Sequence, residues 1–365
     1  MKDFIFRNDT KLLFRNDIRT AVTEITKGHK VMFVYGGGSV KRNGCYDDIV
    51  QTLTDNGIPL AEYGDSSREF AKIQEGIRIA KENGITMIIG AGGASVMDSA
   101  KLIAFGFYHE SDLWNYVKGK NTYGLERLPL ALIPTYPSSG SENGLGAVSV
   151  DSRTGDFGTA YGIPADYALL CPKYSLTLDK EMTTYTGLVT LVQLSACILG
   201  DKNRMSYDAG ISYIRNVLAA TRTLQQHTDD LDARGTILMG AALSTSSRLG
   251  IGKEEPFAYE IYELEFLPEV LFGSTYRRSL TSVFPRFLQA MGKHHAEEIR
   301  NYYRDAFGFD GTIEDSTQKL MTLFAELGIP MYYEGTVSRE AVDAIPCETE
   351  LGKEEVFSII KEMIH

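Results

Sequence analysis

The stretch that most constrains the fold of this chain runs from Thr86 to Lys101, with the sequence TMIIGAGGASVMDSAK. An apolar, β-branched run leads into Gly90, Gly92 and Gly93. Ser95 then stands before a segment with helical spacing of apolar residues, so the order predicts a buried strand, a tight turn and a helix capped by Ser95. Because free N–H groups at such a helix start attract phosphate, the stretch indicates either a phosphate-binding turn or an ordinary strand-to-helix connection.

Two further polar turns follow apolar runs of the same kind. The run Val31–Val34 leads into YGGGS at 35–39, and the run Leu128–Ile133 leads into PTYPSSGSE at 134–142. In a parallel sheet, loops at the carboxyl ends of neighbouring strands meet at one crevice, where such folds bind nucleotides. The three turns together therefore predict a single nucleotide site.

These turns resemble the signatures of one family, the iron-containing alcohol dehydrogenases, and most closely its NADP-dependent butanol dehydrogenase and aldehyde reductase branch. The first, YGGGSVKRNG at 35–44, is similar to the YGGGSVK turn of that branch. The second, GGASVMDSAK at 92–101, is similar to GGGSVxDxAK, with Ala94 in place of a glycine. The third, TYPSSGSE at 135–142, is similar to TxPATGSE, and Trp114 extends the similarity beyond the turns.

The resemblance implies NADP(H) as the cofactor, with NAD(H) as the alternative. No acidic residue follows the first strand in the turn, so a charge that would repel a 2′-phosphate is missing there. Lys41 and Arg42 either pair with that phosphate or form a solvated helix start. Asp98 matches the family aspartate near the nicotinamide, or is an acid favoured in the first turn of a helix. The residues predicted to bind the cofactor are Gly36, Gly37, Gly38, Ser39, Gly92, Gly93, Ser95, Asp98, Thr135, Tyr136 and Ser139.

Alternating strand and helix patterns continue from Val31 to about Pro172 and predict a parallel, doubly wound sheet. Before them, residues 1–16 resemble a β-hairpin. After about Ser175, apolar residues recur at every third or fourth position, which predicts helices. We therefore expect a Rossmann-like α/β nucleotide domain at 1–175 and an all-helical domain at 176–365, and the resemblance implies the fold shared with dehydroquinate synthase. The predicted helices cover about 185–199, 207–226, 231–247, 257–267, 275–291, 295–307, 313–327 and 353–363.

The positions where family members bind a metal are occupied by other side chains. The resemblance implies one aspartate and three histidines, holding a divalent metal that polarises the substrate oxygen. Here these positions fall on Val189, Gln193 and Glu260 and near Tyr276. Valine has no donor atom, and iron and zinc prefer several imidazole, thiolate or carboxylate ligands. The sequence therefore predicts no catalytic metal, and the acidic residues around Glu260 are expected to be solvated or paired with Arg277 and Arg278.

A metal-free reductase needs another group to protonate or polarise a carbonyl oxygen. Tyr276 is the preferred candidate because it occupies a former ligand position, and the other candidates are Tyr259, Tyr262, Lys253 and Arg277. Two functions stay open. The first is an NAD(P)-dependent oxidoreductase that interconverts an alcohol and an aldehyde or ketone, with altered or no metal dependence. The second is a nucleotide-binding homologue without dehydrogenase activity that has a regulatory or assembly role.

The composition excludes several partners. Asp and Glu number 48 against 37 Lys and Arg, and the net charge of −11 repels nucleic acid and anionic membranes. No apolar run reaches the roughly 18 residues that a membrane span needs, and the Met1-Lys2-Asp3 start lacks a signal-peptide core, so a cytoplasmic protein is expected. The four cysteines form no CxxC pair and are expected to be reduced. The resemblance also implies a homodimer acting on a small-molecule alcohol or carbonyl substrate.

Overall fold

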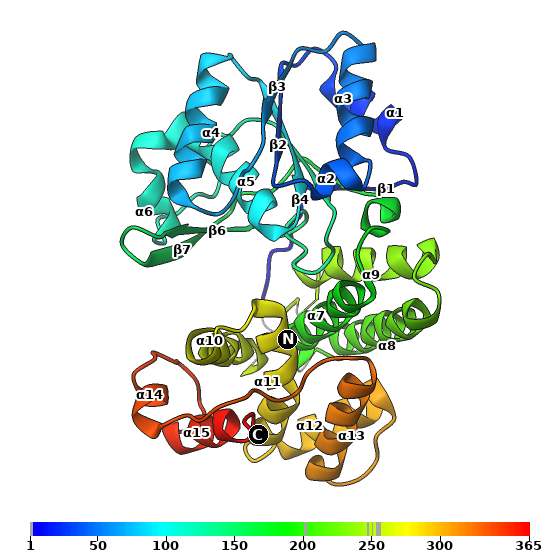
Figure 1. Ribbon diagram of the computed structural model, residues 1–365, viewed down its shortest axis with the longest axis vertical. Coiled ribbons are helices and arrows are strands. Elements are labelled where there is room, and N and C mark those ends of the chain that lie inside the picture. Colours follow the sequence, from blue (N-terminus) through cyan, green and yellow to red (C-terminus); the bar gives the residue numbers. More distant parts are fainter. Residues whose placement is uncertain (1–2, 201–202, 247, 250, 253–256) are drawn as a thin grey trace. The chain divides into compact units, whose positions relative to one another are not determined.

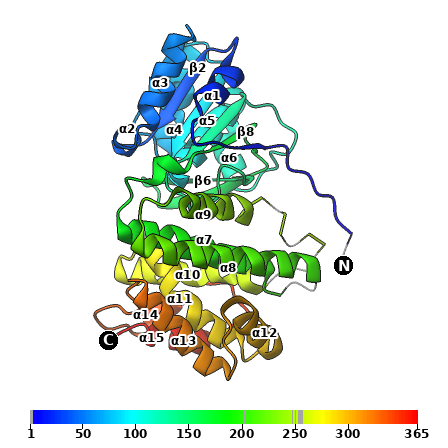
Figure 2. The ribbon, with the colours of Figure 1, turned by 90° about the vertical axis from the view of Figure 1, so that its right-hand side faces the viewer.

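The chain forms two compact units (Figures 1 and 2). The computed structural model describes residues 3–200, 203–246, 248–249, 251–252 and 257–365. We call the first unit the sheet unit and the second the helical unit. The sheet unit comprises Arg7–Leu178 and Ala241–Ser247, and the helical unit comprises Met1–Phe6, Asp179–Gly240 and Arg248–His365.

The sheet unit is built on six parallel strands in the order β1-β8-β5-β4-β2-β3. All residues of β2, β4 and β5 are buried. Such continuous burial is typical of parallel strands that are covered on both faces, and it explains their unbroken apolar runs. The strands are β1 (Lys11–Phe14), β2 (Val31–Tyr35), β3 (Leu60–Tyr63), β4 (Met87–Gly92), β5 (Leu130–Pro134) and β8 (Tyr167–Leu170).

Helices cover both faces of this sheet (Figure 1). On one face, α1 (Arg19–Thr26) and α3 (Cys45–Asp55) pack against the strands, and the short α2 (Ser39–Arg42) precedes α3. On the other face lie α4 (Phe70–Glu82), α5 (Ala94–His109) and α6 (Leu113–Val117), with the 3-10 turn η1 (Glu110–Asp112) between the last two. The two cores together confirm the predicted doubly wound α/β arrangement.

The N-terminal hairpin predicted for residues 1–16 is wrong. Only Lys11–Phe14 forms a strand among the described residues of this segment, and it pairs in parallel with β8 rather than with its own neighbours. The reason is tertiary, because Leu13 packs into the core and the Thr10 hydroxyl donates to the carbonyl oxygen of Ala165 at 2.9 Å. A true hairpin forms later, where β6 (Gly146–Asp151) pairs antiparallel with β7 (Asp156–Tyr161).

The helical unit is organised around α7 (Lys180–Ile198), which is buried at every position from Thr183 onward. Asp179 caps it by accepting from the backbone N–H of Met182 at 2.7 Å. No described strand of either sheet lies beyond residue 170, so the predicted all-helical second half is confirmed. Within the described part of the chain, no helix is both long and apolar enough to cross a membrane. The other elements are η2 (Pro172–Ser175), α8 (Arg204–Gln226), α9 (Leu231–Ser244), η3 (Phe257–Glu260), α10 (Ile261–Phe272), α11 (Tyr276–Met291), α12 (Ala296–Phe307), α13 (Ile313–Glu326), α14 (Arg339–Asp343) and α15 (Lys353–Lys361).

Candidate functional site

The three predicted nucleotide turns lie side by side at one edge of the sheet. Tyr35 of β2 pairs with Ala91 of β4, and Gly92 of β4 pairs with Pro134 of β5, so the chain leaves all three strands at the same level. The backbone N–H of Thr135 also donates to the carbonyl oxygen of Gly92 at 2.9 Å. The strand order reverses between β2 and β4, and open α/β sheets bind ligands at such a switch point.

Two of the glycines are required by close packing against the first turn of α5. A Cβ atom on Gly92 would lie 2.9 Å from the Cβ of Val96, and one on Gly36 would lie 3.0 Å from a methyl of the same valine. The predicted cap by Ser95 is wrong, since Gly93 is the N-cap and no side chain caps the helix. The Ser95 hydroxyl instead accepts from the backbone N–H of Arg68 at 3.1 Å.

A loop that the sequence analysis did not identify joins the first two glycine turns. Residues 64–69 follow β3, and the backbone N–H of Ser66 donates to the carbonyl oxygen of Tyr35 at 3.0 Å. The Ser66 hydroxyl also lies 2.8 Å from that of Ser99 on α5. The sequence Gly-Asp-Ser-Ser after a short strand, at 64–67, is the signal that would have indicated another polar turn at this edge.

Asp98 is buried between two of these loops. Its carboxylate accepts from Nε of Arg68 at 3.2 Å through one oxygen and from the Ser141 hydroxyl at 2.6 Å through the other. Only 4% of the residue is exposed. Both carboxylate oxygens therefore hold parts of the site together, and any contact of Asp98 with a nicotinamide stays a prediction.

The third loop is held from its far side by the end of α9. The side chain of Asn143 donates to the carbonyl oxygen of Ala242 at 2.9 Å, and the Thr245 hydroxyl donates to that of Gly140 at 2.6 Å. Gly140 has a φ of +63°, and a Cβ there would lie 2.1 Å from the carbonyl oxygen of Ala241. The loop therefore fits against this segment only with glycine at position 140. Within the loop, Ser139 accepts from the backbone N–H of Ser141.

A buried lysine and a buried glutamate lie beneath the same loop. Lys101 is fully buried and its ammonium donates to the carbonyl oxygens of Gly144 at 2.8 Å and Gly146 at 2.9 Å. Burial lowers the pKa of Lys101 to about 8, against the opposing effect of Asp98 and Glu142. Glu142 is 1% exposed, and among the described residues no donor meets full hydrogen-bond geometry with either of its carboxyl oxygens. Burial raises the pKa of Glu142 to about 7, although its own backbone N–H and Lys101 act in the opposite direction.

At the outer end of the first turn, Glu62 of β3 accepts hydrogen bonds from the hydroxyls of Tyr35 at 2.9 Å and Tyr46 at 2.8 Å. The ammonium of Lys41 lies 4.6 Å from the centre of the Tyr46 ring. Arg42 reaches back beside Gly38, where an added Cβ would meet its guanidinium at 3.1 Å. Two cations and one engaged carboxylate therefore surround this turn, and the sequence analysis had not identified Glu62.

The positions that the sequence resemblance assigns to metal ligands, with the last of them near Tyr276, carry a donor set that does not suit iron or zinc. Val189 and Gln193 are buried on α7, and Tyr276 begins α11 with 38% of its surface exposed. The carboxylate of Glu260 accepts from the Thr349 hydroxyl and from the backbone N–H of Glu350. One engaged carboxylate, one amide and one phenol do not match the three protein ligands of a catalytic zinc centre. Among the described residues, no three His, Cys, Asp or Glu side chains gather in a metal-binding group.

The acidic helix α10 does not pair with the arginines of α11 as one interpretation of the sequence expected. The guanidinium of Arg277 lies 5.5 Å from the Tyr185 ring centre, and that of Arg278 donates to the carbonyl oxygen of Tyr332 at 2.7 Å. Burial, with smaller effects from Glu269 and Glu263, raises the pKa of the Glu265 carboxyl well above its usual range. Of the other proposed catalytic groups, Tyr259 is half-exposed, Tyr262 is half-buried, and Lys253 lies outside the described residues.

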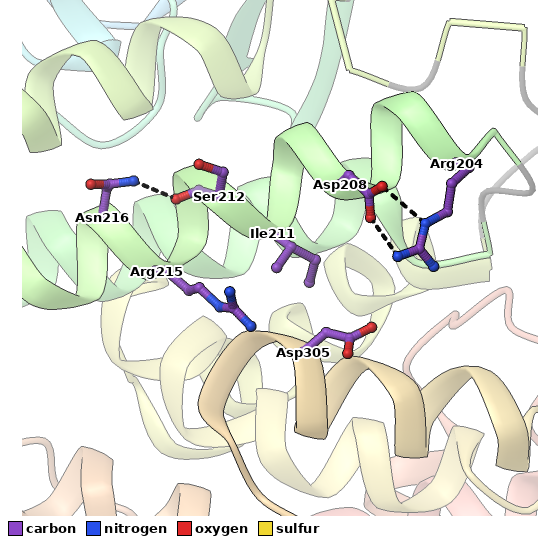
Figure 3. A pocket seen from close by; sticks show the side chains of 7 residues that line it. All are labelled: Arg204, Asp208, Ile211, Ser212, Arg215, Asn216 and Asp305. Atoms are coloured by element: carbon purple, nitrogen blue, oxygen red, sulfur yellow. Dashed lines mark hydrogen bonds and ion pairs between the residues drawn. The ribbon is translucent and has the colours of Figure 1, made fainter.

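One surface groove of the helical unit contains none of the candidate catalytic residues. It has a volume of about 330 Å³ and lies between α8 and Asp305 of α12 (Figure 3). Arg204 is paired with Asp208 at 2.9 Å on its wall. The groove is shallow and its side chains are of mixed charge, so we assign it no role in the chemistry.

Comparison with known proteins gives consistent similarities. A family model described as iron-containing alcohol dehydrogenase matches residues 9–176. The NADP-dependent alcohol dehydrogenase 3 of Entamoeba histolytica is 30% identical over 271 residues, which cover 69% of this chain and 68% of that protein. The NADH-dependent butanol dehydrogenase A of Clostridium acetobutylicum is 26% identical, covering 90% of this chain and 88% of the relative. The crystal structure of an NADH-dependent butanol dehydrogenase A from Thermotoga maritima has the same fold, with a TM-score of 0.89, 24% identity and coverage of 100% and 99%.

Proposed function

Because the chain belongs to the iron-containing alcohol dehydrogenase family, we propose that it is an NAD(P)-dependent oxidoreductase that interconverts an alcohol and an aldehyde or ketone. The observation that carries this proposal is the meeting of three turns at the carboxyl ends of β2, β4 and β5. Close-packed glycine turns at the switch point of a parallel sheet are typical of nucleotide-binding sites. Relatives with an NADH-dependent and with an NADP-dependent activity both match the chain, so family membership alone does not select the nucleotide.

We propose NADP(H) as the preferred nucleotide. Lys41 and Arg42 flank the first turn, whereas the nearest strand-end carboxylate, Glu62, is already engaged by two tyrosine hydroxyls. A 2′-phosphate would therefore meet two cations there. Calorimetric titration should show tighter binding of NADP(H) than of NAD(H), and Lys41→Ala should reduce the difference. Equal affinity in the wild-type protein would remove the preference.

We further propose that the reaction does not use a catalytic metal. The support is the donor set at Val189, Gln193, Glu260 and Tyr276, in which the single carboxylate is bound to Thr349 and to the Glu350 backbone. Protein expressed with added iron and zinc should then contain no stoichiometric metal. The variant with Val189→Asp, Gln193→His, Glu260→His and Tyr276→His together should gain metal affinity, measured by elemental analysis after dialysis. Near one equivalent of metal in the wild-type protein would contradict the proposal.

Tyr276 is the proposed proton donor to the carbonyl oxygen while hydride leaves the nicotinamide. Its phenol is half-exposed at the start of α11, at a position where family members have a metal ligand. Loss of a general acid slows the chemical step by about 10²–10⁴-fold, so Tyr276→Phe should lower kcat by that factor without changing nucleotide affinity. Tyr213→Phe, which changes a partly exposed tyrosine on α8 of the same unit that is not among the catalytic candidates, is the matched control. Equal rates in both variants would exclude this role.

The second candidate function is a nucleotide-binding homologue without dehydrogenase activity, which has a regulatory or assembly role. The same four metal positions favour it, because an unchanged family mechanism has no metal ligands here. A panel of aldehydes and ketones of different size, each incubated with NADPH and the protein, separates the two functions. Oxidation of NADPH that depends on the carbonyl compound supports the oxidoreductase. Tight nucleotide binding without turnover on the panel supports the alternative.

A further inference from the structure

Arg68 lies between the second glycine turn and β6, although no sequence signature points to it. Its backbone N–H donates to the Ser95 hydroxyl at 3.1 Å in the first turn of α5. Its carbonyl oxygen accepts from the backbone N–H of Val150 and from the Ser149 hydroxyl, both at 3.0 Å. The backbone of Arg68 is thereby fixed to both α5 and β6.

The side chain of Arg68 is oriented by a buried carboxylate. Its Nε lies 3.2 Å from one oxygen of Asp98, whose other oxygen accepts from the Ser141 hydroxyl at 2.6 Å. Because Asp98 is buried and held from the third loop, the direction of the guanidinium follows from the arrangement of the turns. Asp98 thus connects the Arg68 loop, the second glycine turn and the third loop.

The two terminal nitrogens of this guanidinium are available to a ligand. In the part of the chain that the structure describes, Asp98 is the one polar partner of the Arg68 side chain, and it contacts Nε alone. The side chain is 37% exposed. A guanidinium that uses its terminal nitrogens matches two oxygens of one phosphate, and such bidentate contacts are stronger than neutral hydrogen bonds.

We propose that Arg68 binds the pyrophosphate of the nicotinamide nucleotide, with Asp98 as the residue that positions it. This inference rests on the proposed function, because the nucleotide has to lie along the same three turns. The ion pair with Asp98 alone would explain a structural role, in which Arg68 fastens the start of α4 to α5. The two roles predict different effects on ligand affinity. If Arg68 binds phosphate, its contribution to affinity depends on the charge of the ligand. If its role is structural, that contribution is the same for charged and uncharged ligands.

Calorimetric titration of the full chain with ADP and with adenosine separates the phosphate-binding role of Arg68 from the structural one. Adenosine, the weaker ligand, is measured by competition with ADP. Loss of charge-assisted bonds to a phosphate should weaken ADP binding by about tenfold or more in Arg68→Met, and leave adenosine binding within about twofold. Arg68→Lys should recover part of the loss, and Asp98→Asn should weaken ADP binding by a smaller factor. Arg78→Met is the control, because Arg78 is an exposed α4 arginine paired with Glu82 at 2.7 Å.

ADP affinity in Arg68→Met within about twofold of the wild type would overturn the inference, as would equal losses for ADP and adenosine. If Arg68→Met does not fold, the wild-type protein decides. Its ADP affinity should fall with ionic strength more steeply than its adenosine affinity, and equal dependence would overturn the inference. If the wild-type protein binds none of these ligands, the proposed function is overturned as well. If the wild-type protein binds ADP and Arg68→Met binds it with the same affinity, only the role of Arg68 is overturned.

Discussion

Glu142 should make the stability of the sheet unit depend on pH, and Glu142→Gln should remove this dependence. The carboxyl is 1% exposed beneath the third loop, and no described residue donates to either oxygen with full hydrogen-bond geometry. Among the described residues, Lys101 on α5 is the charged group that acts on it, and residues 241–246, which pack on the loop, contribute no titratable side chain. Burial therefore dominates, and the folded protein holds the proton more tightly than the unfolded chain.

The magnitude follows from the two pKa values. The pKa of Glu142 rises from 4.5 to about 7 on folding, and this difference corresponds to about 3 kcal/mol. Because the folded-state pKa is the higher one, the contribution to stability is fully present below pH 4.5 and is lost as the pH rises through 7. For a unit of this size, a change of about 3 kcal/mol moves Tm by about 6–12 °C.

The assay is thermal unfolding of the wild-type protein and of Glu142→Gln between pH 5 and 8. Lys101, whose pKa is about 8, begins to titrate at the upper end of this range in both proteins. The Tm of the variant minus that of the wild type should increase across this range by about 6–12 °C. Glu126→Gln, which changes an exposed carboxylate of the same unit, should leave the difference constant. Parallel curves for wild type and Glu142→Gln would show that a donor or water satisfies the carboxyl in solution, and would refute the reasoning.

Three further predictions follow from the same loop and from the helical unit. Gly140→Ala should lower Tm much more than Gly124→Ala, because both have a positive φ, which costs about 1–2 kcal/mol in either variant, but only the first places a Cβ 2.1 Å from a carbonyl oxygen. Equal losses would contradict the packing of the loop on α9. Lys101, whose pKa burial lowers to about 8, should make the wild-type protein gain stability between pH 8 and 10.5, and urea unfolding of Lys101→Met should show no such gain. Identical alkaline slopes would exclude a buried ammonium. Treatment with a chelator should leave NADPH oxidation unchanged, and loss of activity that added iron or zinc restores would show that the metal ligands lie elsewhere in the chain.

The parts of the fold that the sequence predicted are those specified by local patterns. β-Branched runs ending in glycine mark β2 and β4, and the helical spacing after 175 marks the helical unit, because each pattern acts within one element. The hydrogen bond of Ser95 depends on another segment, since its hydroxyl accepts from the backbone N–H of Arg68 instead of capping α5. The hairpin expected at 1–16 failed for the same reason, because β8 offered a better partner to Lys11–Phe14.

The candidate site was predicted to the extent that glycine turns specify it. Gly36 and Gly92 allow their turns to pack closely against Val96 of α5. Glycines at the ends of apolar runs can be recognised directly in the sequence. Glu62 is an ordinary polar residue of the short strand β3 and Arg68 follows that strand, and only the pairing of β3 with β2 brings them to the turns. The contact of the third loop with 241–246 joins segments about 100 residues apart, and no local pattern predicts such a contact.

Transfer of deuterium tests the central claim most directly. NADPH deuterated at C4 of the nicotinamide, on either face in separate reactions, is incubated with the protein and an aldehyde that supports NADPH oxidation, and the alcohol is analysed by mass spectrometry. An NAD(P)-dependent oxidoreductase should place one deuterium on the former carbonyl carbon from one of the two faces, at a rate unaffected by chelator. Absence of deuterium in the alcohol from both forms, while the nucleotide binds, would contradict the account and leave the nucleotide-binding homologue as the function.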